Sequence, residues 1–259
     1  MDEREAVLKV AAAAKSRWLS FFDGAPNGHP LVFCLPFAGG GASFYHPWAQ
    51  LAPKSFSMIA VQPPGREDRL FERSFERMPD LVAATADALI PFLHSPYALF
   101  GHSMGGMLAY ELAQELRRRN APLPMHLFVS GAPAPHVAGQ IPPIYHLPEP
   151  QLLDEIRRRY RGLPDEVLQS RELLDLLLPR LRADLAVTGT YVYRDSPPLT
   201  CPITAFGGED DETVTPAMIA AWREHTVTSF RSEMFPGGHF FVSNVASRII
   251  AALAEGVSK

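Results

Sequence analysis

Six short apolar runs recur along the chain, and most stay nearly continuous in apolar character until they end at Gly or Pro. Runs of this kind are typical of strands buried on both faces of a parallel sheet. Segments with helical spacing of apolar positions lie between most of them, and alternating strands and helices favour an open α/β sheet. The predicted strands cover residues 31–37, 57–65, 97–103, 127–133, 201–208 and 230–238.

Two helical segments also carry end signals. In residues 78–94, apolar positions recur at helical intervals behind Pro79, which suits the first turn of a helix. Residues 107–120 end in three arginines and an asparagine, and a basic last turn complements the negative end of a helix dipole. Both segments are therefore predicted to be helices that follow strands.

One interval breaks the alternation. Residues 134–198 contain apolar and charged positions at helical spacing and no convincing strand, and the interval is far longer than an ordinary connection between a strand and a helix. We expect an inserted helical lid there, within a single domain of residues 1–259. The alanine-rich start, with helical character over residues 3–22, predicts a helical N-terminal extension at residues 1–28.

Composition narrows the class of protein. The 259 residues are 47% hydrophobic and 20% charged, as in ordinary globular proteins, and the formal net charge is -4. This charge gives no electrostatic basis for binding nucleic acid or an anionic membrane. Lys9 and Lys15 interrupt the N-terminal apolar stretch, so neither a signal peptide nor a membrane span is predicted. The two cysteines, Cys34 and Cys201, are expected to be buried reduced thiols, and the expected location is cytoplasmic.

The stretch FGHSMGG, residues 100–106, sets Ser103 between Gly101 and Gly105, directly after a predicted strand and before a predicted helix. A nucleophile elbow requires this strand-turn-helix setting, because a serine on a sharp turn needs small neighbours. A glycine-rich turn with an incidental serine is the alternative. The downstream sequence has to discriminate, since a serine hydroxyl needs a base and the base needs an orienting acid.

The acid and the base both follow late strands, in the order found in α/β-hydrolases. Asp210 and Asp211 come directly after the strand at residues 201–208, and His239 lies on a Gly-Gly turn after the last strand. Chemistry alone leaves either aspartate open, although Asp211 is favoured. His102, next to the serine, is expected to point away from it. No metal-binding motif is present, so a metal site is not expected.

A second glycine-rich stretch follows the first core strand, at residues 35–48. The backbone N–H of Phe37 or Ala38 is predicted to form an oxyanion hole together with that of Met104, because an oxyanion needs donors from this loop and from the elbow. A phosphate-binding loop is the weaker alternative, since neither G-x-G-x-x-G nor a P-loop pattern occurs.

The chain resembles the type II (editing) thioesterases that accompany polyketide synthases and non-ribosomal peptide synthetases, enzymes of the α/β-hydrolase fold. The similar segments are LPFAGGGASFYHPWAQLAP, VQPPGREDR, FGHSMGGMLAYELA, FGGEDDETVTPAMIAAW and FPGGHFF. The resemblance places the family's catalytic residues on Ser103, Asp211 and His239, and its Gly-Gly-x-x-Asp-x-x-Val arrangement selects Asp211 over Asp210. It implies a mostly parallel sheet with helices on both faces and an inserted helical lid.

What the resemblance implies about function is hydrolysis of acyl or aminoacyl thioesters from the phosphopantetheine arm of a carrier protein, which removes aberrant or stalled chains. The partners would be an acyl or peptidyl carrier protein and small acyl substrates, with no cofactor of the enzyme's own. Two alternatives within hydrolases remain open, a fatty-acyl carrier thioesterase and a general carboxylesterase. A third is a non-catalytic member of the fold that binds a ligand or a synthase partner.

Overall fold

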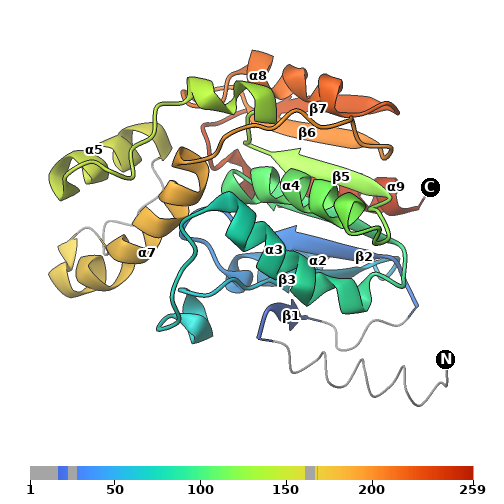
Figure 1. The fold of residues 1–259 in the computed structure, drawn as a ribbon, viewed down its shortest axis with the longest axis horizontal. Coiled ribbons are helices and arrows are strands. Elements are labelled where there is room, and N and C mark those ends of the chain that lie inside the picture. Colours follow the sequence, from blue (N-terminus) through green and yellow to red (C-terminus); the bar gives the residue numbers. More distant parts are fainter. Residues whose placement is uncertain (1–16, 23–27, 161–166, 168, 259) are drawn as a thin grey trace.

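The computed structural model describes residues 17–22, 28–160, 167 and 169–258, and its centre is a seven-stranded sheet (Figure 1). The strand order is β1-β3-β2-β4-β5-β6-β7, and every pairing is parallel except that of β1 with β3. The strands are β1 (Leu19–Phe21), β2 (Leu31–Leu35), β3 (Ser57–Val61), β4 (Tyr97–His102), β5 (His126–Ser130), β6 (Ile203–Gly208) and β7 (Phe230–Phe235). All six predicted strands are present.

The sheet is buried on both faces, as the continuous apolar runs predict. In β2, Leu31, Phe33 and Leu35 pack into one hydrophobic cluster, whereas Val32 and Cys34 pack into another. Successive side chains of a strand point to opposite faces, so one apolar run supplies both layers.

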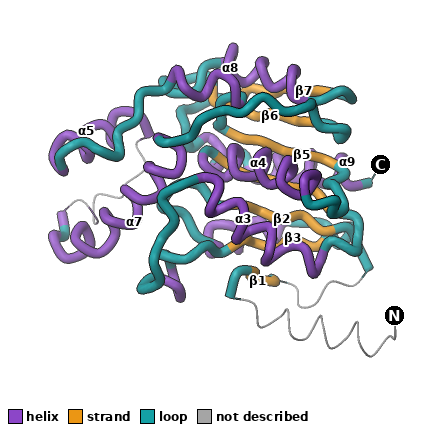
Figure 2. Tube along the Cα trace, viewed as in Figure 1, coloured by secondary structure: helices purple, strands orange, loops and turns teal. Residues whose placement is uncertain are grey.

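Helices cover both faces (Figure 2). On one face α3 (Met78–Leu89) and α4 (Met104–Arg118) share the larger cluster with α8 (Pro216–Ala220). On the other, α2 (His46–Leu51) packs against α9 (Ala246–Val257). This arrangement confirms the predicted fold class, a mostly parallel sheet between two layers of helices.

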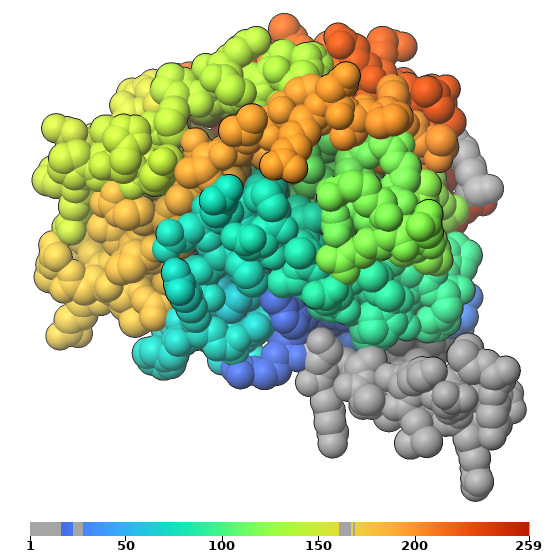
Figure 3. Space-filling model, in the orientation of Figure 1, coloured from blue at the N-terminus to red at the C-terminus, as the bar shows by residue number. Residues whose placement is uncertain are grey.

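The interval between β5 and β6 is helical, as predicted. It contains α5 (Glu149–Tyr160) and α7 (Arg171–Gly189), preceded by a 3₁₀ helix at Pro135–Gln140. In Figures 1 and 3, α5 and α7 form the left side of the molecule, beyond the sheet. These two helices pack on each other through a small cluster of their own: Ile144, Leu152, Ile156, Leu178 and Leu185.

The prediction of a helix over residues 3–22 is wrong at its C-terminal end. Leu19–Phe21 form strand β1, antiparallel to β3 with Leu19 opposite Val61, and the Gln62 N–H donates to the Trp18 carbonyl at 2.7 Å. An edge of β3 that would otherwise lack a partner is satisfied in this way. The rest of the predicted N-terminal helix, residues 1–16, lies outside the described residues.

Among the helices in the described ranges, none combines the length and apolar character needed to cross a membrane.

Candidate active site

Ser103 occupies the sharp turn between β4 and α4. Its backbone has φ 55° and ψ -119°, in the left-handed region that a non-glycine residue rarely adopts, and its N–H donates to the Ser130 carbonyl at 2.7 Å. Glycine is required on both sides. A Cβ on Gly101 would clash with the carbonyl oxygen of Gly105, and one on Gly105 would clash with that of Leu35. The residue types that predict an elbow are thus the ones that its backbone can accommodate.

The loop after β7 brings His239 to the tip of this turn. The His239 Nε2 lies 2.9 Å from the Ser103 Oγ, and its Nδ1 lies 2.7 Å from the Asp211 Oδ2. The side chains of His239 and Asp211 are 3% and 0% exposed, so water has little access to the bond between them. With Nδ1–H donating to the carboxylate, Nε2 is free to accept the serine proton, the arrangement of a nucleophile, a base and an orienting acid.

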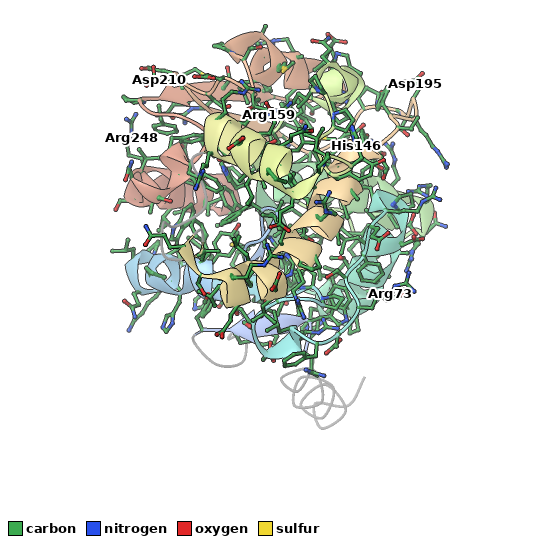
Figure 4. All side chains as sticks on the ribbon, turned by 90° about the vertical axis from the view of Figure 1, so that its left-hand side faces the viewer. Arg73, His146, Arg159, Asp195, Asp210 and Arg248 are labelled. Atoms are coloured by element: carbon green, nitrogen blue, oxygen red, sulfur yellow. The ribbon has the colours of Figure 1, made fainter. Side chains whose placement is uncertain are left out.

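The two adjacent aspartates have different environments. Asp211 is buried, and its second oxygen, Oδ1, accepts the Thr213 N–H at 2.8 Å and the Val214 N–H at 3.1 Å. Asp210 is exposed and lies at the edge of the molecule in Figure 4. Only Asp211 of this pair contacts His239, and both of its carboxylate oxygens are held in place.

His102 lies beneath this group and is fully buried. Its Nδ1 lies 2.9 Å from the Ser130 Oγ, and its ring centre lies 5.2 Å from that of His239. Burial lowers the pKa of His102 well below its usual range, and the neighbouring His239 lowers it further. A neutral ring here supports His239 by packing without adding a positive charge next to it.

The predicted oxyanion donors line a cavity at Ser103. Phe37 and Ala38 follow β2 and border this cavity, and Met104 is the first residue of the 15-residue helix α4. Within the part of the chain that the structure describes, the N–H groups of Phe37 and Ala38 donate to no protein acceptor. The Met104 N–H belongs to the first turn of α4, where no intrahelical acceptor exists. These amides are available to a negative oxygen.

Two cavities of unequal size meet at Ser103 and His239. The larger, about 560 Å³, runs between the glycine-rich loop and α7, with Glu67, Arg180 and Asp184 among its lining residues. The smaller, about 80 Å³, is lined mostly by apolar side chains such as Met107, Ile144 and Val214. A substrate with two arms on either side of its reacting bond fits this division.

Tyr160 borders both cavities and was not singled out from the sequence. It is the last residue of α5. The centre of its ring lies 4.8 Å from the centre of the His239 ring. Burial raises the pKa of Tyr160, which keeps the phenol neutral over the imidazole. Its sequence context is a run of arginines on a helix with no motif, so only the packing of the inserted segment reveals the contact.

The described side chains offer no metal site, because no group of three or more His, Cys, Asp or Glu gathers among them.

Comparisons with known proteins agree with the site. The model of the thioesterase domain matches residues 30–255. The gramicidin S biosynthesis protein GrsT of Aneurinibacillus migulanus is 42% identical over 211 residues, 82% of each chain. Among solved structures, the RedJ thioesterase from the prodiginine pathway of Streptomyces coelicolor is 42% identical, with a TM-score of 0.81 and coverage of 88% of this chain and 90% of that one. The type II thioesterase BorB of the borrelidin cluster is 37% identical, with a TM-score of 0.82 and coverage of 93% and 97%.

The match spans strands β2 to β7, the elbow at Ser103 and the loop that carries His239. The chain therefore belongs to the thioesterase family, is similar to its type II members, and is a thioester hydrolase.

Proposed function

We propose that the chain is an editing thioesterase, which hydrolyses acyl or aminoacyl thioesters from the phosphopantetheine arm of acyl or peptidyl carrier proteins and so removes aberrant or stalled chains. The observation that carries this proposal is the contact of His239 with both Ser103 and Asp211. The relatives named in gramicidin S, prodiginine and borrelidin biosynthesis support the assembly-line substrate. We further propose a cytoplasmic location, consistent with two buried cysteines that form no disulfide.

In the proposed mechanism, His239 removes the Ser103 proton as the Oγ attacks the thioester carbonyl. The Met104 amide and that of Phe37 or Ala38 hold the oxyanion of the tetrahedral intermediate. Collapse of the intermediate breaks the C–S bond, and the thiolate leaves with the proton from the imidazolium. Water, deprotonated by the same ring, then attacks the acyl-serine ester, and the free acid is released as Ser103 recovers its proton.

The two cavities assign the arms of the substrate. A phosphopantetheine arm contains more than a dozen non-hydrogen atoms, so we place it in the larger cavity, beside the glycine-rich loop and α7. The acyl group then enters the smaller, apolar cavity of about 80 Å³. A space of that size favours short acyl groups over long ones.

The direct test is release of the acyl group from an acetyl-loaded carrier protein, followed by mass spectrometry. We expect release by the wild-type protein, and a Ser103→Ala variant should lose activity by a factor on the order of 10⁶. Release by the variant at the wild-type rate would contradict the assignment of Ser103.

A panel of substrates separates the remaining alternatives. Acyl carrier protein, acyl-CoA and p-nitrophenyl esters should be turned over in that order of preference. Preference for simple esters would indicate a general carboxylesterase, and preference for long fatty-acyl carriers would indicate a fatty-acid enzyme. Failure of Ser103 to react with a fluorophosphonate would indicate a binding protein without catalysis.

A further inference from the structure

The glycine-rich loop beside Ser103 is held by two charged side chains from distant parts of the chain. The Asp184 Oδ2 accepts the Gly39 N–H at 2.7 Å, and the Arg66 Nη1 donates to the Gly40 carbonyl at 2.8 Å. Gly39 is the residue after Ala38, whose amide is one of the proposed oxyanion donors. The first bond therefore fixes the peptide unit directly after the donors, and the second fixes the Gly40–Gly41 unit further along the loop.

Asp184 and Arg66 also bind each other. The Arg66 Nη2 lies 2.7 Å from the Asp184 Oδ1, and the side chains are only 9% and 4% exposed for Arg66 and Asp184. Both Asp184 oxygens are thus used, one on the loop amide and one on the guanidinium. Arg66 binds the loop carbonyl and the carboxylate at once, a fork geometry that lysine cannot reproduce.

The position of Asp184 is unusual for a carboxylate. It lies in α7 within a buried stretch that is otherwise apolar, from Ala183 to Val187. A buried ion pair is weak as a source of stability, because apolar residues of similar volume often serve as well. The contacts of the pair with the glycine-rich loop therefore explain its presence better than a contribution to the free energy of folding does.

The inserted segment and the main body meet at this point. Arg66 follows β3, whereas Asp184 belongs to α7, and the Arg180 Nε of the same helix donates to the Leu70 carbonyl at 2.8 Å. Figure 3 shows the corresponding teal and gold surfaces side by side. Placement of α7 and placement of the loop are therefore coupled through one carboxylate.

We infer that Asp184 and Arg66 are positioning residues, which align the oxyanion-binding loop with Ser103 and make this alignment depend on α7; the inference rests on the proposed function. With the Asp184–Arg66 ion pair bound to the loop, the amides of Phe37 and Ala38 are fixed before the reaction begins. Stabilisation of an oxyanion requires donors that are fixed in this way. The alternative is a pair that only anchors the inserted segment to the body.

The test compares Asp184→Asn with Asp175→Asn. Both changes remove one negative charge from α7, and Asp175 is 57% exposed and paired with Arg171 at the surface. An asparagine at position 184 has one acceptor oxygen for two donors. We expect kcat on an acetyl N-acetylcysteamine thioester to fall about 10- to 100-fold in Asp184→Asn, less than loss of a whole oxyanion donor, with KM within about twofold. Asp175→Asn should match the wild type.

A trifluoromethyl ketone supplies the readout that an anchoring role would not move, because it forms a tetrahedral oxyanion on the serine. Its affinity should fall by the same factor as kcat/KM in Asp184→Asn. Thermal unfolding monitors the fold. Should Asp184→Asn fail to fold, Arg66→Lys keeps the charge but loses the fork, and a smaller loss of both quantities is expected.

The outcomes separate the two proposals. A wild-type protein that hydrolyses no thioester overturns the proposed function. A wild-type protein that is active, with an Asp184→Asn variant whose kcat and ketone affinity equal those of Asp175→Asn, overturns the positioning role alone. A change confined to the unfolding temperature assigns the pair to anchoring and also overturns it.

Discussion

At the scale of single residues, the neighbours Asp210 and Asp211 give the sharpest contrast. The Asp211 carboxylate accepts hydrogen bonds from the His239 ring and from two backbone amides, whereas Asp210 is exposed. In the proposed mechanism the carboxylate fixes the tautomer in which Nε2 accepts a proton, and asparagine would favour the wrong one.

We therefore expect Asp211→Asn to lower kcat about 10⁴-fold, with the protein still folded. Asp210→Asn carries the same chemical change one position away and should stay within about twofold of the wild type. Steady-state kinetics on one thioester, together with circular dichroism, checks both variants. Equal losses in the two variants would contradict the assignment of Asp211.

The sequence predicts which side chains meet at the candidate site better than it predicts what surrounds them. Order along the chain identifies Ser103 and His239, because each follows a strand on a glycine-rich turn. It leaves Asp210 against Asp211 to the family resemblance, since adjacent side chains share every local signal. Tyr160 and Asp184 carry no local signal, and the family-like segment VQPPGREDR predicts no contact for its Arg66. The contacts of all three residues depend on how the inserted helices pack over the sheet.

At the scale of elements, strands buried on both faces are the most predictable part, since their apolar runs are long and continuous. Strand β1 was missed because three residues after an alanine-rich stretch give no alternation to detect, and their conformation depends on pairing with β3. The inserted helices were predicted from spacing. The spacing does not predict how these helices pack against each other and over the two cavities.

The smaller cavity makes a prediction about acyl length. Met107 of α4 lines that cavity only, so Met107→Ala should enlarge it and raise the ratio of kcat/KM for hexanoyl over propionyl thioesters about 10-fold or more. The change also costs about 2–5 kcal/mol of stability.

Leu112→Ala is the matched control, because Leu112 is a buried core residue of the same helix and lines neither cavity. It should lose comparable stability and leave the hexanoyl-to-propionyl ratio unchanged. A ratio that moves equally in both variants would mean that the smaller cavity does not hold the acyl group.

At the scale of the whole molecule, buried histidines make folding sensitive to acid. Burial lowers the pKa of His225 to about 4, and the neighbouring His136, 2.7 Å away between ring nitrogens, contributes. His102 shifts in the same direction. A histidine whose pKa is lower in the folded state stabilises the fold above its unfolded pKa, near 6.5, and this stability is lost as the pH falls.

The free energy of unfolding should therefore decline between pH 6.5 and about 4, by at most about 1.4 kcal/mol per pH unit for each such group. Urea titrations at pH 7, 6, 5 and 4.5 measure the slope. His225→Gln should reduce it, whereas His146→Gln, at an exposed position in the inserted segment, should not. Parallel curves for the wild type and His225→Gln would contradict this account.

The order of the strands has a consequence for how the molecule comes apart. β4, which ends at the elbow, is the fourth of seven strands, with three on each side. Local opening starts where few neighbours resist it, so amide hydrogens in β1 and β7 should exchange with solvent well before those of β4. The turn that shapes Ser103 would be among the last features to disappear, and partly opened molecules would keep Ser103 in its strained conformation.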